Sequence, residues 1–299
     1  MNEGEAFLEA LEQKARILAP GARATYEANK DLCSWLLNPL ARWAEAAYGK
    51  QIFEDAARGY ASYCIGVAQA QRIYEKAGRY TPEAMPEIMS GVYEDEGYMV
   101  PYMWAAILIY AFWPSMVNHL AMFREDFLRR LPANARILEL ACGHGVLSLL
   151  AAEERPDIQI EGLDISPPAI AVAERLLKVS GHSGNVKFGT KDALQANGSM
   201  ESDVYQGIIS AMLAEHLPEP KPLFSAMGRM VSKDGLVYFS TAIESAQRDH
   251  VYEYNQESEP LQMAESAGLR VSLLVSDAGL PSAGGRFLPR ATAMILQRR

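Results

Sequence analysis

The chain has 299 residues, of which 49% are hydrophobic, enough to bury the core of one large domain or two ordinary ones. Its net charge of −9 and its pI of about 5.2 argue against nucleic acid as a partner, because proteins that bind nucleic acid usually present a basic face. We therefore expect a globular protein whose partner is a small-molecule substrate.

The three cysteines, Cys33, Cys64 and Cys142, are scattered along the chain and form no CxxC pair. They also lack the His/Cys spacing of a metal site, so we expect free thiols and no metal centre. The first residues, MNEGEAFLEALEQKAR, are acidic and lack the basic end and apolar core of a signal peptide. Both features favour a cytoplasmic protein.

The first 131 residues predict an all-helical domain, because apolar residues recur every three or four positions and glycine turns are few. Proline and glycine mark the breaks between helices, for example at Asn38-Pro39. The predicted helices are Glu5–Leu18, Ala22–Leu36, Pro39–Tyr48, Ile52–Lys76, Pro82–Tyr93, Pro101–Trp113 and Ser115–Arg130.

Between Gly97 and Phe123 the chain has no Asp, Glu, Lys or Arg, which raises the alternative of a transmembrane helix. Pro101 and Pro114 interrupt this segment, and its longest apolar run is shorter than the about 20 residues that a bilayer requires. We expect instead a buried helical pair and no membrane partner.

Such a pair, immediately before the first strand, could also wall a substrate pocket. Tyr98, Tyr102 and Met103 would then contact the substrate, together with Met212 from a later strand end. The alternative is that these side chains are simple core, which is the more common role of aromatic residues at helical spacing.

Residues 136–164 predict one βαβ unit: a strand at Arg136–Leu140, a glycine turn, a helix at Val146–Glu154 and a second strand that ends at Asp164. The strands are short apolar runs, whereas the helix has apolar residues at helical spacing. Gly143 and Gly145 carry no Cβ, so the turn between them can approach a ligand closely. The unit therefore predicts a nucleotide-like ligand.

Two cofactors would fit this geometry, because Asp164 follows Gly145 by 19 residues and could accept hydrogen bonds from both hydroxyls of a ribose. For a nicotinamide dinucleotide the third glycine of G-x-G-x-x-G is missing, since Ser148 stands there. Glu139 would also repel a pyrophosphate, whereas it would attract the cationic sulfonium and ammonium groups of S-adenosyl-L-methionine (SAM). The sequence therefore favours SAM.

Glu139, Ala141, Gly143 and Gly145 resemble the first motif of the class I SAM-dependent methyltransferases, an acid followed by three glycines at alternate positions. Ala141 replaces the first of these glycines. The resemblance covers roughly residues 133–299. It implies an N-terminal helical domain used for dimerisation and substrate binding, as in some members of the family.

Beyond Asp164 the pattern continues with a helix, SPPAIAVAERLLKVSG, and a third strand at Val186–Thr190. Asp192, just past that strand, matches the family position that faces the adenine amino group. The resemblance implies a SAM site made of Glu139, Ala141, Gly143, Gly145, Asp164, Ile165, Asp192, Ala193 and Ala211.

A fourth strand within VYQGIISAML, a fifth at Leu236–Thr241 and two last strands at Arg270–Ser276 and Ala291–Gln297 complete the pattern. The long segment GLPSAGGRFLPRA between the last two predicts a mobile loop over the pocket. The fold class is therefore α/β, a Rossmann-like methyltransferase sheet of seven strands with a terminal hairpin. This domain would span residues 132–299, after a helical domain at residues 1–131.

Glu215 and His216 follow the fourth strand, in the segment that lies beside the transferred methyl group in this family. His216 could act as a general base, because the ordinary pKa of histidine is near neutrality, and Glu215 could orient it. The alternative is a histidine that only supports a turn.

The sequence thus predicts a SAM-dependent methyltransferase that acts on oxygen or carbon, rather than nitrogen, of a small molecule in specialised metabolism. A homodimer is expected, because the helical half has more apolar surface than one core can hide. Two alternatives remain open: a SAM-fold protein that serves as an interaction module without methyl transfer, and another SAM-dependent enzyme on the same fold.

Overall fold

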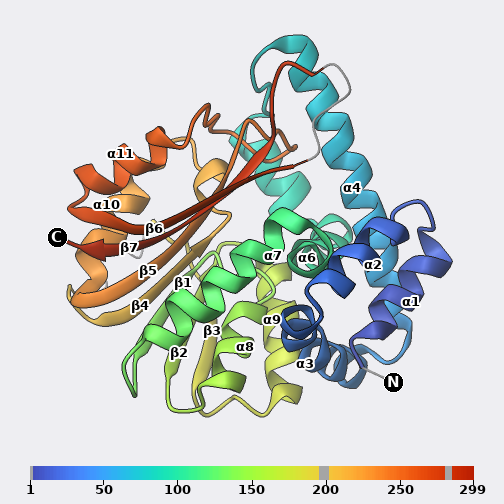
Figure 1. Ribbon diagram of the computed structural model, residues 1–299, viewed down its shortest axis with the longest axis horizontal. Coiled ribbons are helices and arrows are strands. Elements are labelled where there is room, and N and C mark those ends of the chain that lie inside the picture. The colour runs from blue at the N-terminus through green and yellow to red at the C-terminus, as the bar shows by residue number, and fades with distance from the viewer. Residues whose placement is uncertain (1–2, 195–201, 280–284) are drawn as a thin grey trace.

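The computed structural model describes residues 3–194, 202–279 and 285–299, and these residues form a seven-stranded sheet with helices around it (Figure 1). The strand order is β3-β2-β1-β4-β5-β7-β6, and only β7 runs antiparallel to its neighbours. The strands are β1 (Arg136–Leu140), β2 (Gln159–Asp164), β3 (Val186–Thr190), β4 (Tyr205–Ala211), β5 (Val231–Ile243), β6 (Leu269–Ala278) and β7 (Arg290–Arg298). The predicted sheet with its terminal hairpin is confirmed.

Alternate residues of the central strands face two different cores, as the pleat of a strand requires. Ile137, Ile209 and Tyr238 pack with the N-terminal helices and with α8. Leu138 and its neighbours on the opposite face pack with α10 and α11. The helices of the sheet region are α8 (Val146–Glu154), α9 (Pro167–Ser180), α10 (Lys221–Met230) and α11 (Ser258–Ser266).

The region before β1 is helical, as predicted. Its helices are α1 (Glu5–Lys14), α2 (Ala19–Ala28), α3 (Lys30–Tyr48), α4 (Gln51–Ala77), α5 (Met85–Ile88), α6 (Glu96–Phe112) and α7 (Pro114–Ala121). One apolar cluster extends from Phe7 in α1 to Ile295 in β7, so the helices and the sheet share a core. A division into two domains at residues 131 and 132 stays a prediction.

Two predicted helix boundaries at proline were wrong. Pro39 lies inside α3, and Pro101 lies inside α6, which begins five residues earlier at Glu96. Asp95 caps α6, because its carboxylate accepts hydrogen bonds from the backbone N–H of Gly97 at 2.8 Å and of Tyr98 at 3.4 Å. Burial of the residues around each proline offsets the lost hydrogen bond, so tertiary packing overrides the local signal.

Two other predicted helices contain π-helical turns. The helix expected from Pro82 begins instead at Met85 and continues as a π-helical turn at Met89–Tyr93. The helix that includes α7 continues through a second π-helical turn at Met122–Phe127 and ends in a short 3-10 turn at Leu128–Arg130. The first of these turns carries Tyr93 toward the carboxyl edge of the sheet, where it becomes part of the candidate site.

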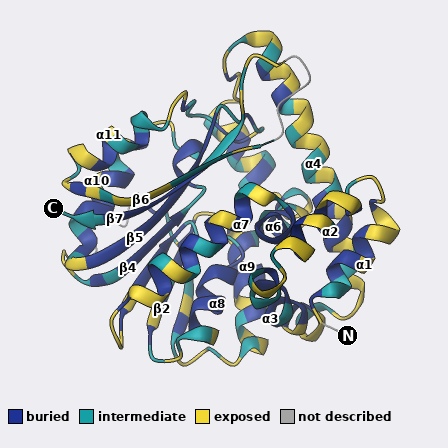
Figure 2. Ribbon diagram, viewed as in Figure 1, coloured by how far each residue is buried: buried dark blue, intermediate teal, exposed yellow. Residues whose placement is uncertain are grey.

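The apolar segment predicted as a buried pair forms α6 and α7, and most residues of α6 are buried (Figure 2). In the described part of the chain no single helix is long and apolar enough to cross a membrane. By length and composition alone, the bent pair Glu96–Phe112 and Pro114–Arg130, with an angle of 84° between its halves, passes that test.

Candidate active site

The turn after β1 is the tightest feature of the carboxyl edge. Ala141, Gly143 and Gly145 have φ angles of 57°, 52° and 68°, in the left-handed region that favours glycine. A Cβ atom at Gly145 would come within 2.4 Å of the Phe188 ring, and one at Gly143 within 3.1 Å of Met103 Sδ. The turn can adopt this conformation because Gly143 and Gly145 have no side chains, and its backbone therefore remains accessible to a ligand.

Asp164, at the end of β2, holds this turn in place. Its Oδ2 accepts a hydrogen bond from Gly143 N at 2.8 Å, and its Oδ1 accepts one from Ser166 N at 2.8 Å. Burial raises the pKa of this carboxyl above its usual range, although the two backbone donors oppose the rise. Each oxygen keeps a second lone pair, so the carboxylate can also accept hydrogen bonds from a ribose.

Glu139, on β1, is 2% exposed and accepts a hydrogen bond from Ser148 Oγ. Burial raises its pKa to about 8, because a buried carboxylate loses its hydration. The carboxyl is therefore mainly protonated at neutral pH. A cationic group bound nearby would favour its ionised form.

The other predicted cofactor residues also lie at the carboxyl ends of parallel strands. Ile165 follows β2 and is 40% exposed, and Ala211 ends β4. Asp192 follows β3, and its Oδ1 accepts a hydrogen bond from Leu194 N at 2.8 Å. Ala193 is buried beside it. The structure thus gathers the predicted cofactor residues along the ends of β1 to β4, where ligands bind in open α/β sheets.

His216 lies in a short turn, Ala214–His216, that follows β4. Its Nδ1 is 3.1 Å from the Tyr93 hydroxyl, 3.1 Å from the backbone oxygen of Asp249 and 3.3 Å from Asp249 Oδ2. The Asp249 side chain is 1% exposed, so the pair is shielded from water. Sequence reasoning missed both Tyr93 and Asp249, which lie far from His216 in the chain.

The charge of this pair follows from its surroundings. Burial by itself would lower the pKa of His216, but the carboxylates of Asp249 and Glu215 outweigh burial and raise that pKa to about 9. Burial would likewise raise the pKa of Asp249, and the imidazolium outweighs it and lowers that pKa to about 2. His216 and Asp249 therefore form an ion pair at neutral pH.

Glu215 is fully buried and acts within this cluster rather than at a surface. Its Oε2 accepts a hydrogen bond from Thr241 Oγ1 at 2.8 Å, and its backbone oxygen accepts bonds from Val251 N at 2.9 Å and Tyr252 N at 3.0 Å. Burial raises the pKa of its carboxyl. Glu215 thus fixes the segment after β5 against the turn that carries His216.

His250 completes the cluster. Its ring meets the His216 ring edge to face, with 4.8 Å between centroids, and its Nδ1 donates to Ser245 O at 2.7 Å. Burial lowers its pKa to about 3, so it is neutral. Glu215, His216 and His250 offer atoms within 4.8 Å of one another, a grouping of metal-ligand types that sequence spacing did not indicate. The proton on His216 and its pairing with Asp249 favour a hydrogen-bonded cluster.

Tyr93 connects this cluster to the cofactor residues. Its hydroxyl contacts His216, and its backbone oxygen accepts a hydrogen bond from Ser166 Oγ at 2.6 Å. Ser166 also caps α9 and follows Asp164 by two residues. One residue therefore joins the histidine to the end of β2.

A cavity of about 520 Å³ lies beside the cluster, between α4, the start of α6 and the segment after β5. His250 is one of its lining residues. Tyr98 and Tyr102, two of the four predicted substrate contacts, also line it. Met103 and Met212 are not among them. Met103 lies against Gly143 instead, and the backbone N–H of Met212 donates to Ser240 O at 2.9 Å.

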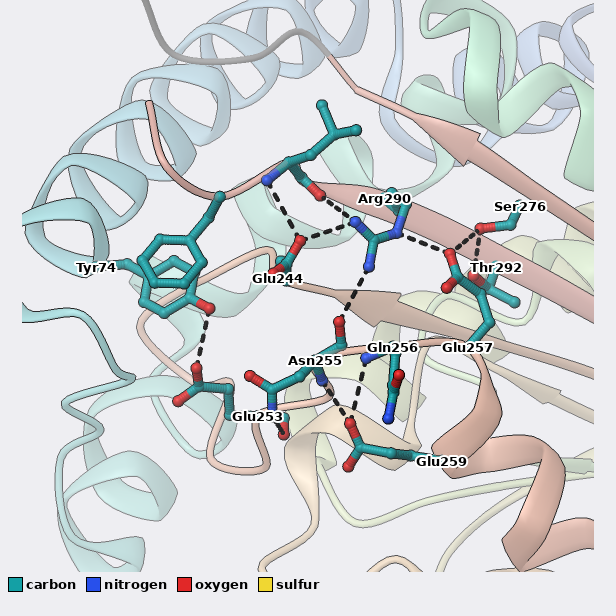
Figure 3. A network of polar contacts seen from close by, with 12 residues as sticks. Tyr74, Glu244, Glu253, Asn255, Gln256, Glu257, Glu259, Ser276, Arg290 and Thr292 are labelled. Carbon is teal, nitrogen blue, oxygen red and sulfur yellow. Dashed lines mark hydrogen bonds and ion pairs between the residues drawn. The ribbon is translucent and has the colours of Figure 1, made fainter. Parts of the chain in front are cut away.

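A polar network joins the segment after β5 to the start of β7, and Tyr74, a residue of the cavity wall, lies beside it (Figure 3). Arg290, at the start of β7, contacts Glu244 Oε2 at 2.8 Å and Glu257 Oε1 at 2.7 Å. Tyr74 of α4 donates to Glu253 Oε1 at 2.9 Å. These contacts fasten the segment that carries Asp249 and His250 to both the sheet and α4.

The loop expected over the pocket lies partly outside the described residues, at positions 280–284. Its described end is held on α4, because Glu75 accepts hydrogen bonds from Arg286 N at 2.8 Å and Phe287 N at 3.1 Å. Phe287 also stacks on Tyr74, with 4.0 Å between ring centroids. This part of the loop therefore lies against a residue of the cavity wall.

Residues 131–274 match a family model described as a methyltransferase domain. The chain carries a class I SAM-dependent methyltransferase domain. Curated relatives agree: the ubiquinone biosynthesis O-methyltransferase of Nitrosospira multiformis is 31% identical over 126 residues, covering 42% of this chain and 50% of that protein. The enzyme of the same description from Nitrosomonas europaea is 30% identical over 159 residues, covering 46% of this chain and 65% of that protein. The chain thus spans about half to two thirds of the length of these relatives.

Solved structures share the fold of this methyltransferase domain. Phosphoethanolamine N-methyltransferase 2 of Haemonchus contortus, in complex with SAM, superposes with a TM-score of 0.55 at 14% identity, covering 73% of this chain and 60% of that one. The [4+2]-cyclase SpnF superposes with a TM-score of 0.51 at 14% identity, covering 62% of this chain and 83% of that one. SAM is the cofactor of the family, and the open glycine turn between two buried acids fits it.

Proposed function

We propose that the chain is an active methyltransferase that transfers the methyl group of SAM to a small-molecule acceptor, with oxygen or carbon favoured over nitrogen. The observation that carries this proposal is the His216–Asp249 pair, which Tyr93 joins to the end of β2 and which lies beside His250 of the cavity wall. A hydroxyl or an enolisable carbon must lose a proton during transfer, whereas a free amine needs no base. A histidine at this position suits the first two acceptors.

The reaction would be an in-line displacement. The acceptor atom forms a bond to the methyl carbon as the carbon–sulfur bond breaks, and the electron pair of the broken bond stays on sulfur. Alignment in a site closed to water supplies most of the rate. His216, once neutral, would take the acceptor proton, while Asp249 holds the imidazole in orientation and Glu215 positions the turn.

The test is turnover of methyl-labelled SAM with a set of phenolic, enolic and amine acceptors, together with calorimetry of SAM binding. His216→Gln and Asp249→Asn should lower the methylation rate by about 10² to 10⁴ and leave the Kd of SAM within about twofold. Asp164→Ala should weaken SAM binding by about tenfold to a hundredfold, because it loses paired hydrogen bonds. No SAM binding by the wild type would overturn the proposal. SAM binding without any turnover would favour an interaction module.

We propose that the acceptor differs from that of the relatives. The residues of α4 and α6 that line the cavity precede residue 131, where the family match begins. For this reason we place the reaction in specialised metabolism and do not transfer the substrate of the ubiquinone pathway. Competition between an acceptor found in the screen and a ubiquinone precursor would test this point.

We also propose a homodimer in the cytoplasm. Ile65 and Ile73, on α4, are 57% and 56% exposed, and apolar surface of this kind supports pairing. Cys33 and Cys142 are buried free thiols, which suits a reducing compartment. Light scattering of the purified chain tests the dimer, and fractionation of cells tests the location.

A further inference from the structure

We propose that the cavity beside His250 is the acceptor site and that it takes a flat, uncharged aromatic molecule of two or more fused rings with a hydroxyl group. Methyl transfer to this molecule depends on the proposed function, whereas binding of the molecule in the cavity does not. Its basis is the shape and chemistry of the cavity wall, which comes from α4, α6 and the segment after β5.

The walls are made of tyrosine rings that pack against one another. Tyr98 and Tyr102 are stacked at 6.1 Å with 22° between their planes, and Tyr63 meets Tyr102 edge to face at 5.7 Å. Tyr74 and Tyr80 form a second pair, with 4.9 Å between centroids. Such rings offer flat apolar contact area, and aromatic ligands gain additional stabilisation from stacking on them.

Beside Tyr63 and Tyr74, α4 presents a smooth strip to the cavity, because small residues recur there at helical spacing. Gly59, Ser62, Gly66 and Ala70 all line it. At Gly59 the space is filled, since a Cβ would lie 2.6 Å from Pro101 O. At Gly66 a Cβ would meet nothing within 4 Å, so the cavity extends to the helix backbone. A flat molecule can therefore lie between this strip of α4 and the rings of Tyr98 and Tyr102 on α6.

The charges of the lining residues exclude two other ligand classes. Glu83 and Arg248 are the charged side chains in the described wall, and they pair at 3.0 and 3.1 Å. No cation is therefore left to bind a phosphate or carboxylate. The Arg248 guanidinium also lies over the Tyr98 ring, 5.4 Å from its centroid. It would repel a quaternary ammonium and already occupies the ring face that such a group would use.

The polar groups that remain can orient a neutral acceptor. The hydroxyls of Tyr98 and Tyr102 make no hydrogen bond within the described part of the chain, so they are available to ring oxygens. His250 marks the inner end of the cavity, next to His216. The same helix, α6, also reaches the glycine turn, because Met103, next to Tyr102, contacts the Gly143 position.

The test uses alizarin, a dihydroxylated fused-ring probe, in an absorbance titration of the full 299-residue chain, at a pH at which the absorbance of the free probe shows it to be uncharged. Gly66→Trp should weaken its binding at least tenfold, because the indole fills the cavity and the open Cβ position avoids a clash. Gly21→Trp is the matched control: Gly21 is also helical with nothing within 4 Å, but it lies in α2, away from the cavity. This variant should bind alizarin within twofold of the wild type, and both variants should keep the wild-type Kd for SAM.

The inference is overturned if alizarin binds wild type and Gly66→Trp equally, or if choline, inorganic phosphate or decanoate binds the wild type more tightly than alizarin. If circular dichroism shows that Gly66→Trp is unfolded, Ser62→Trp, on the same exposed wall, replaces it with the same expected loss. Alizarin binding without methyl transfer to any acceptor would support this inference and refute the proposed function. Methyl transfer without alizarin binding would refute this inference alone.

Discussion

The buried His216–Asp249 pair predicts a specific dependence of stability on pH. The pKa of His216 rises from 6.5 to about 9 on folding, which corresponds to about 3 kcal/mol of stabilisation. Because the folded-state pKa is the higher one, this stabilisation is fully present below pH 6.5 and is lost as the pH rises through 9. The lowered pKa of Asp249 arises from the same ion pair, so its contribution to stability is not added to that of His216. Glu215, Asp164, neutral His250 and Tyr93 also face this pair.

The measurement is the free energy of unfolding from urea titrations at pH 6 and pH 9.5. Wild type should lose about 3 kcal/mol more between these values than His216→Gln, and Asp249→Asn should resemble His216→Gln. His144→Gln is the matched control, because burial lowers the pKa of His144 to about 4 and it is already neutral; this variant should retain most of the wild-type loss. Parallel curves for wild type and His216→Gln would show that the ion pair does not form.

Three further predictions concern the cofactor turn and the helix packing. Ala141→Gly should raise the free energy of unfolding by about 0.5 to 1 kcal/mol. The positive φ of Ala141 costs the folded state about 1 to 2 kcal/mol, and the greater unfolded-state entropy of glycine cancels only part of the gain from removing that cost. The control Ala68→Gly, at an exposed position of α4, should instead lower the free energy of unfolding by about 1 kcal/mol. SAM binding at pH 7 should release protons, visible by calorimetry in buffers of different ionisation enthalpy, and the part released by Glu139 should be absent in Glu139→Gln. Gly59→Ala should lower the melting temperature, since its Cβ would lie 2.6 Å from Pro101 O; an unchanged value would show that α4 can move aside without cost.

The sequence predicted the sheet well because its signals are local. The strands Arg136–Leu140 and Val186–Thr190 and the helix Val146–Glu154 have the predicted bounds, since apolar runs between glycine turns and caps depend on neighbours in the chain. The helical region was harder. At Pro39 and Pro101 a strong local stop signal lost to burial of the surrounding residues, which only the packed structure reveals.

Part of the candidate site was also predictable from local sequence, and part depends on packing. The predicted cofactor residues lie at or just beyond the carboxyl ends of parallel strands, so strand order was enough to bring them to one edge. Asp249 could not be predicted, because it reaches His216 through the path of the segment after β5, held by the backbone oxygen of Glu215. Tyr93 depends on a π-helical turn that no local pattern indicated. Met103 was expected to contact the substrate, but the structure places it at the Gly143 turn.

The charge on His216 connects cofactor binding to catalysis. In the protein alone, Asp249 and Glu215 hold a proton on the imidazole, and the imidazolium in turn opposes part of the rise that burial causes in the pKa of Asp164, at the end of β2. SAM brings a sulfonium cation to this same edge, and a second positive charge nearby lowers the pKa of a histidine. Bound SAM would therefore lower the pKa of His216 from its value in the protein alone. The imidazole would thus take up the acceptor proton more readily when the methyl donor is present, and Tyr93, which contacts both Ser166 and His216, joins the histidine to the end of β2.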